Sequence, residues 1–148
     1  MTDETILFLC AYGGAKSVIA ASYFNRLAGE LELPYVAVAL SAEEPYPAVP
    51  EAVADFLLRD GIDVRSFQPR RVDVGELREA FQVVSIDCNL DGLDLAGTKV
   101  ERWDDVPKPS EDLPASATAI RCRVEALIGG IGTNTSYRPL AEELLGRR

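Results

Sequence analysis

Cys10, Lys16 and Ser17 are the residues whose types and spacing best suggest chemistry. Cys10 precedes Lys16 by six positions and Ser17 by seven, and Gly13 and Gly14 lie between them. A cysteine thiolate is a strong nucleophile, and backbone N–H groups, a helix N-terminus and a nearby cation all stabilise it. The segment therefore predicts a small anion-binding loop with a thiol at its base.

The flanking residues predict a strand before this loop and a helix after it. Residues 6–9 are a short apolar run, typical of a strand that is buried on both faces. A strand that leads through a glycine loop into a helix directs several N–H groups and the positive helix end at one point, which suits an anion. The alternative is that Cys10 is only a buried thiol at a strand end and that the glycines form a simple turn. Apolar residues after Ser17 recur at helical spacing: Ala20, Phe24, Leu27, Ala28 and Leu31.

Length and composition restrict the class of protein. The 148 residues predict one domain, residues 1–148, and a net charge of −9 argues against nucleic acid as a partner. No apolar run reaches the length of a membrane span, and the first residues do not resemble a secretory signal, so we expect a cytoplasmic protein without a membrane partner.

Cysteine and histidine usage restricts the chemistry. Cys10, Cys88 and Cys122 are odd in number and widely spaced, which predicts neither a disulfide framework nor a zinc site. The chain has no histidine, which excludes Cys-His and Ser-His nucleophile pairs and every His-ligated metal. We therefore expect no metal site.

The rest of the chain alternates between strand and helix patterns. Such alternation predicts an α/β fold, a three-layer sandwich with a four-stranded parallel sheet of flavodoxin-like type. Ligands bind such sheets beyond the carboxyl ends of the strands, so Cys10, Cys88 and the loop at 104–114 are expected at one edge. The glycines at 129, 130 and 132 are expected to interrupt the long late helix, and the side chain of Cys122 is expected in the core. Predicted strands are 5–10, 35–40, 83–86 and 99–103; predicted helices are 17–32, 50–60, 73–81 (capped by Asp73), 116–128 and 139–145.

These features together resemble a known family. The order strand, Cys-(five residues)-basic-Ser, helix resembles the phosphate loop of the low-molecular-weight protein tyrosine phosphatases and of the related thioredoxin-coupled arsenate reductases. Ser41-Ala42 after the second strand, Gly61-Ile62-Asp63, and Trp103 before a proline-rich loop also resemble that family's layout. The resemblance extends in order over nearly the whole chain.

The resemblance implies roles for the loop residues. Cys10 would be the nucleophile that attacks phosphorus or arsenic, and the Ser17 hydroxyl would stabilise its thiolate. Lys16 replaces the family's arginine, and a lysine cannot grip two oxyanion oxygens with a planar fork, so impaired or altered activity is expected. Tyr12 would stand at the rim of the site. Backbone amides from the cysteine to the serine would hold the oxyanion, which assigns anion binding to Ala11, Tyr12, Gly13, Gly14 and Ala15.

Two further parts of the family's machinery have weaker counterparts. The family's general acid lies in a Trp-x-x-Pro-Asp-Pro segment, and Lys108 occupies that place here. Asp104 and Asp105 stand close by and are candidate acids, or else ordinary solvated carboxylates. For reductase chemistry Cys88 resembles a resolving thiol, and thioredoxin or another thiol reductant would be required; no other cofactor is expected.

Three functions remain open from the sequence. The first is a Cys10-dependent phosphatase-like or arsenate-reductase-like enzyme. The second is a non-catalytic module of the same fold that binds an oxyanion or a phosphopeptide. The third is a phosphocarrier that resembles the IIB components of sugar phosphotransferase systems. The expected partner is a phosphate-, arsenate- or sulfate-like oxyanion or a phosphorylated substrate.

Overall fold

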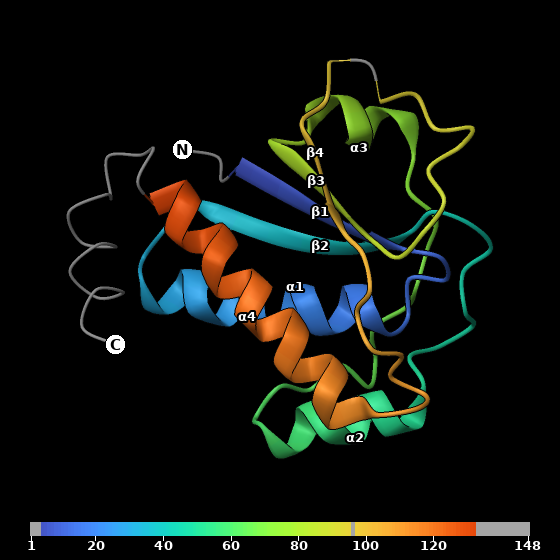
Figure 1. Cartoon of the computed structure of the whole chain (residues 1–148), viewed down its shortest axis with the longest axis vertical. Helices are drawn as coiled ribbons and strands as arrows, with labels where there is room; N and C mark the ends of the chain where they lie inside the picture. The colour runs from blue at the N-terminus through green and yellow to red at the C-terminus, as the bar shows by residue number, and fades with distance from the viewer. Residues whose placement is uncertain (1–3, 96, 133–148) are drawn as a thin grey trace.

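The computed structural model describes residues 4–95 and 97–132 (Figure 1). Strands and helices alternate along most of the chain, as the sequence pattern predicts. In chain order the elements are β1 (Glu4–Cys10), α1 (Lys16–Glu30), β2 (Tyr35–Ser41), α2 (Glu51–Arg59), α3 (Val74–Glu79), β3 (Gln82–Ile86), β4 (Val100–Trp103) and α4 (Leu113–Gly132).

The four strands form one parallel sheet in the order β2-β1-β3-β4. β1 is therefore central, and its carboxyl end is flanked by the ends of β2 and β3. Cys10 pairs in register with Ser41 of β2, and Leu9 pairs with Ser85 of β3. This arrangement confirms the predicted α/β sandwich with a four-stranded parallel sheet, and it brings the segments that follow three strands to one edge.

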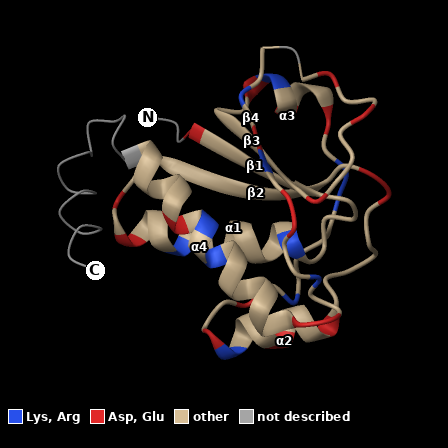
Figure 2. Ribbon diagram, in the orientation of Figure 1, with Lys and Arg blue, Asp and Glu red and all other residues tan. Residues whose placement is uncertain are grey.

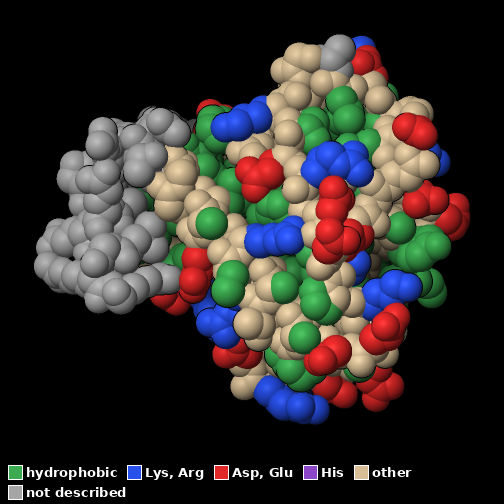
Figure 3. All heavy atoms as spheres, in the orientation of Figure 1, with side chains coloured by type: hydrophobic (Ala, Val, Ile, Leu, Met, Phe, Trp, Pro, Cys, Tyr) green, Lys and Arg blue, Asp and Glu red, His purple; other side chains and the backbone are tan. Residues whose placement is uncertain are grey.

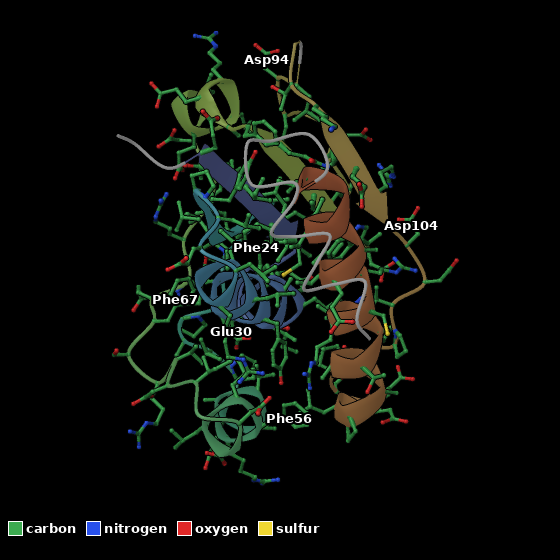
Figure 4. The ribbon with its side chains drawn as sticks, turned by 90° about the vertical axis from the view of Figure 1, so that its left-hand side faces the viewer. Phe24, Glu30, Phe56, Phe67, Asp94 and Asp104 are labelled. Atoms are coloured by element: carbon green, nitrogen blue, oxygen red, sulfur yellow. The ribbon has the colours of Figure 1, made fainter. Side chains whose placement is uncertain are left out.

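Helices cover both faces of the sheet (Figure 1). α1, α2 and α4 lie on one side, where Ile6 and Phe8 of β1 are buried among them, and α3 lies on the other side with Leu7 and Leu9. Figure 4 shows Phe24 between α1 and the sheet, where its ring centroid is 5.9 Å from that of Phe8. β1, β2 and β3 are almost free of charged residues (Figure 2), as expected for strands buried on both faces.

α4 differs from the sequence prediction at both ends. It begins at Leu113 rather than Ser116, because Pro114 is tolerated in a first turn and the Asp112 carboxylate accepts the Ala115 N–H at 3.1 Å. It also continues to Gly132, so the predicted interruption at the glycines is wrong. A glycine costs a helix about 1 kcal/mol, and the burial of apolar residues such as Ile128 at this end offsets that cost.

Two other expectations have clear outcomes. Asp73 caps α3 as predicted, in a capping box in which it accepts the Glu76 N–H at 2.8 Å and the Glu76 carboxylate accepts the Asp73 N–H at 3.1 Å. The predicted helix at 139–145 lies outside the described residues.

None of the helices within the described ranges combines the length and the apolar character needed to cross a membrane.

Candidate active site

The loop between β1 and α1 is fixed against the segment that follows β2. The Ser41 hydroxyl lies 3.0 Å from the carbonyl oxygen of Ala11 and also contacts the carbonyl oxygen of Glu43. Carbonyl groups on the outer side of the loop are therefore used in holding it in place. Three backbone hydrogen bonds connect the two segments: Ala42 N–H to Cys10 O (3.0 Å), Glu43 N–H to Ala11 O (2.9 Å) and Tyr46 N–H to Tyr12 O (3.0 Å).

The geometry of the loop requires glycine at one position and leaves little room at another. Gly13 has a φ of +66°, and a Cβ on it would lie 2.9 Å from both the Cβ and the backbone nitrogen of Ser41, so this position requires glycine. A Cβ on Gly14 would lie 2.6 Å from a ring carbon of Tyr46, so a larger residue fits there only if the Tyr46 side chain shifts.

The N–H groups of the loop remain without acceptors. Within the part of the chain that the structure describes, no N–H of residues 11–17 donates to a backbone or side-chain acceptor. Unpaired N–H groups are costly unless water or a ligand accepts them. α1 also begins at Lys16 with no side chain capping its N-terminus, so the positive end of the helix is open. The loop has the donors of an anion site.

Cys10 and Ser17 meet at the base of the loop. The Cys10 Sγ donates to the Ser17 Oγ at 3.1 Å, and both residues are buried. With Cys10 ionised, the same pair would be held by the hydroxyl donating to the thiolate. The contact is one that the role implied by the resemblance for Ser17 would require, and that role stays a prediction.

Lys16 does not point freely into solvent. Its Nζ donates to Oδ2 of Asp87 at 2.9 Å, and the two side chains are only 14% and 25% exposed. Asp87 directly follows β3 and also accepts the N–H groups of Asp105 and Val106, at 2.8 and 2.9 Å. The Asp87 carboxylate therefore connects Lys16 to the segment that follows β4.

These contacts set the ionisation of Asp87. Burial by itself raises the pKa of this carboxyl. The hydrogen bonds from Lys16 and from the two backbone N–H groups outweigh burial and hold the pKa below its usual value. Asp87 is consequently a carboxylate at neutral pH.

A pocket of about 210 Å³ opens above the loop. Its walls come from the loop, from the segment after β2, from the end of β3 and from the segment after β4. The rings of Tyr12 and Tyr46 pack at a centroid distance of 5.0 Å and are 45% and 38% exposed, which places an aromatic pair at the mouth. The lining residues are Cys10, Ala11, Tyr12, Ala15, Lys16, Tyr46, Ile86, Asp87, Lys108, Pro109 and Ser110.

Asp104 and Asp105, the candidate acids, do not line this pocket. The Asp104 carboxylate lies 3.7 Å from Arg102, and Figure 4 shows Asp104 beyond the end of β4 at the periphery of the molecule. Asp105 contacts Asp87 through its backbone N–H and not through its side chain. Its φ is +62°. The structure does bring Lys108 to the pocket, as the position in the sequence suggested.

The other two cysteines have different surroundings from Cys10: Cys88 packs on the face of the sheet that α3 covers, and Cys122 is on α4. Cys88 is buried with Leu7 and Leu9, and its Sγ is 3.6 Å from the carbonyl oxygen of Leu9. Burial raises the pKa of the Cys88 thiol, although the hydrogen-bonding hydroxyl of Ser85 opposes the increase. Cys122 is exposed on α4, so the expectation of a core position was wrong.

Asp87 and Tyr46 were missed by sequence reasoning. Asp87 stands directly after a predicted strand, at the edge where ligands bind, and this position was a usable signal. Tyr46 lies in the irregular connection after β2, and nothing in the sequence pattern marks it. Among the described residues, no group of three or more His, Cys, Asp or Glu side chains is arranged to hold a metal ion.

Comparison of the structure with solved structures finds similar folds. An arsenate reductase from Archaeoglobus fulgidus has a TM-score of 0.70 and 26% identity, over 84% of this chain and 98% of that one. A low-molecular-weight protein tyrosine phosphatase from T. tengcongensis has a TM-score of 0.74 and 18% identity, over 85% and 98%. A thioredoxin-dependent arsenate reductase from Corynebacterium glutamicum has a TM-score of 0.77 and 16% identity, over 90% and 64%.

In contrast, comparison by sequence finds no match: no model of a protein family and no curated protein sequence matches the chain. The chain has the fold shared by the low-molecular-weight protein tyrosine phosphatases and these arsenate reductases. The structural similarity supports the prediction that it is a divergent member of that family.

Proposed function

We propose that the chain is a Cys-dependent phosphatase-like or arsenate-reductase-like enzyme that binds an oxyanion in the loop from Cys10 to Ser17. The observation that carries the proposal is that no acceptor among the described residues takes the N–H groups of residues 11–17, which lie next to the thiol and the open N-terminus of α1. A tetrahedral oxyanion offers several acceptors within a few ångströms of each other, which is what this set of donors requires.

In the phosphatase reaction the Cys10 thiolate attacks phosphorus and the bond from phosphorus to the leaving oxygen breaks. Water then hydrolyses the phosphocysteine and releases phosphate and the free thiol. The loop N–H groups and Lys16 stabilise the charge on the non-bridging oxygens, which is where such sites gain most of their rate. Because Lys16 is a point charge already paired with Asp87, we expect slower turnover than an arginine would give.

Among the described residues that line the pocket, none is a protonated carboxylic acid that could serve as the proton donor for the leaving group, and Lys108 stands in the place of the family's acid. Asp87 is the carboxyl group that lines the pocket, and its pKa is held low by its donors. A positioned general acid contributes about 10²–10⁴ to a rate, so esters with poor leaving groups should suffer most. Substrates whose leaving group needs no proton therefore suit the site best.

In the reductase reaction Cys10 attacks arsenate, and a second thiol attacks the Cys10 sulfur, so that a disulfide forms as As(V) becomes As(III). Cys88 is the candidate second thiol within the chain. It packs with Leu7 and Leu9 on the other face of the sheet, yet it is near enough to Cys10 for the two thiols to interact electrostatically. An external thiol such as thioredoxin is the alternative. Either route requires a thiol reductant to restore Cys10, and neither requires a metal.

The test compares Cys10→Ser with Cys122→Ser, which removes an exposed thiol far along the chain on α4. p-Nitrophenyl phosphate and arsenate are assayed with and without added thiol. We expect Cys10→Ser to abolish turnover of at least one substrate and Cys122→Ser to retain it. Equal rates for the two variants and the unaltered protein would exclude Cys10 as a nucleophile.

A non-catalytic module that binds an oxyanion is the second candidate. The pairing of Lys16 with Asp87 favours it, since it withdraws the cation that would otherwise stabilise a transition state. Phosphate binding without turnover of either substrate would support this second function.

A further inference from the structure

Asp87 places a carboxylate inside the pocket that should receive an anion. Asp87 and Cys10 line the same pocket of about 210 Å³, and Lys16 lies between the loop and the carboxylate. A carboxylate so close to a bound anion repels it, and it also competes with the anion for the three N–H donors of the Lys16 ammonium.

The repulsion depends on the charge of the ligand. Coulomb energy is proportional to the product of two charges, so a dianion is repelled by Asp87 twice as strongly as a monoanion at the same place. Lys108 also lines the pocket, but its side chain is 71% exposed and lies 3.7 Å from Glu111, so solvent screens it. The Asp87 side chain is 25% exposed and is screened less than Lys108, so Asp87 has the larger effect of these two on selectivity.

We propose that Asp87 determines specificity by lowering the affinity of the Cys10–Ser17 loop for dianions more than for monoanions. Relative to a loop without this carboxylate, the site is then less selective for dianions over singly charged tetrahedral oxyanions and esters. This inference rests on the proposed function, because it concerns the ligand of the same loop.

Asp87→Asn is the variant that isolates the charge. Asp87 has a φ of +46°, a conformation that asparagine tolerates far better than most residues do. The N–H groups of Asp105 and Val106 donate to different oxygens of Asp87, so the single amide oxygen of asparagine can keep one of these two hydrogen bonds. The variant therefore removes the negative charge and retains one contact with the segment after β4.

The experiment measures the binding of sulfate and of perchlorate by calorimetry at constant ionic strength. The two ions are both tetrahedral but differ by one unit of charge. A pair of unit charges a few ångströms apart at a solvated site changes affinity by about threefold, so Asp87→Asn should tighten perchlorate about threefold and sulfate about tenfold. The matched control is Asp63→Asn, which makes the same change in net charge at an exposed carboxylate outside the pocket, and it should change neither affinity by more than about twofold.

Comparing the change in perchlorate affinity with the change in sulfate affinity distinguishes an effect of charge from an effect of altered structure. A variant that simply loosened the loop would weaken both ions, and a local rearrangement would change both by the same factor. Either result would overturn the inference while leaving anion binding by the loop intact. A failure of every protein to bind either ion would overturn both the inference and the proposed function.

Discussion

Replacing Lys16 with methionine should destabilise the fold as well as the site. Methionine keeps the length and helix propensity of lysine but removes the ammonium that donates to Asp87 at 2.9 Å. The Asp87 side chain is 25% exposed, and it would keep only its two backbone donors. Leaving a fully buried polar group without one of its partners costs about 1–3 kcal/mol, and partial exposure lowers that cost, so we expect a loss of about 1 kcal/mol in the free energy of unfolding at pH 7.

The loss should depend on pH in a defined direction. The folded-state pKa of Asp87 lies below that of the unfolded chain, so its contribution to stability is present above about pH 4 and disappears as pH falls through the folded-state pKa. Without Lys16, burial is opposed by fewer donors and this pKa rises. The difference between the variant and the unaltered protein should therefore shrink on acidification below about pH 4.

Urea unfolding followed by fluorescence measures this effect. Trp103 is the only tryptophan in the chain and is 3% exposed, so its emission reports global unfolding. Lys108→Met is the matched control, because that side chain is 71% exposed and should cost less than about 0.5 kcal/mol. The reasoning would be refuted if Lys16→Met were as stable as Lys108→Met at pH 7, or if its deficit were the same at every pH.

Two further predictions follow from the site. Gly14→Ala places a Cβ 2.6 Å from the Tyr46 ring and should cost about 1–3 kcal/mol in urea unfolding, most of which Tyr46→Ala should restore in the double variant; additive losses would contradict this contact. Phenyl phosphate should be turned over about 10²-fold more slowly than p-nitrophenyl phosphate, because no protonated carboxylic acid among the described pocket residues is placed to protonate the poorer leaving group. Equal kcat/KM values for the two esters would instead point to a proton donor in the site.

The sheet and its loop could be predicted from local sequence patterns. An apolar run, two glycines and a helical repeat define the path from β1 to α1, and each of these signals lies within a few residues of the structure that it predicts. The same holds for the capping box of Asp73. The length of α4 was missed because the side chain of Asp112 and burial at the far end, rather than propensity alone, set its limits.

The electrostatics of the site could not be predicted in this way. Lys16 and Asp87 are 71 positions apart, and they meet only because β3 lies beside β1 in the sheet. The same long-range contact makes Asp105 a backbone donor to Asp87 rather than an acid. The face of the molecule in Figure 3 mixes acidic and basic side chains without a broad basic area. The net charge of the chain is −9, so the pocket rather than the overall charge must account for any anion binding.

The central claim is that the N–H groups of residues 11–17 receive a tetrahedral oxyanion. The most direct measurement is a titration of the ¹⁵N-labelled, reduced protein with phosphate, followed by amide chemical shifts. The account predicts saturable downfield shifts of the amide protons in residues 11–17, as expected when N–H groups gain an acceptor. Saturable shifts confined to other residues, such as those around Arg26 and Arg121 on α1 and α4, or no shifts at millimolar phosphate, would contradict it.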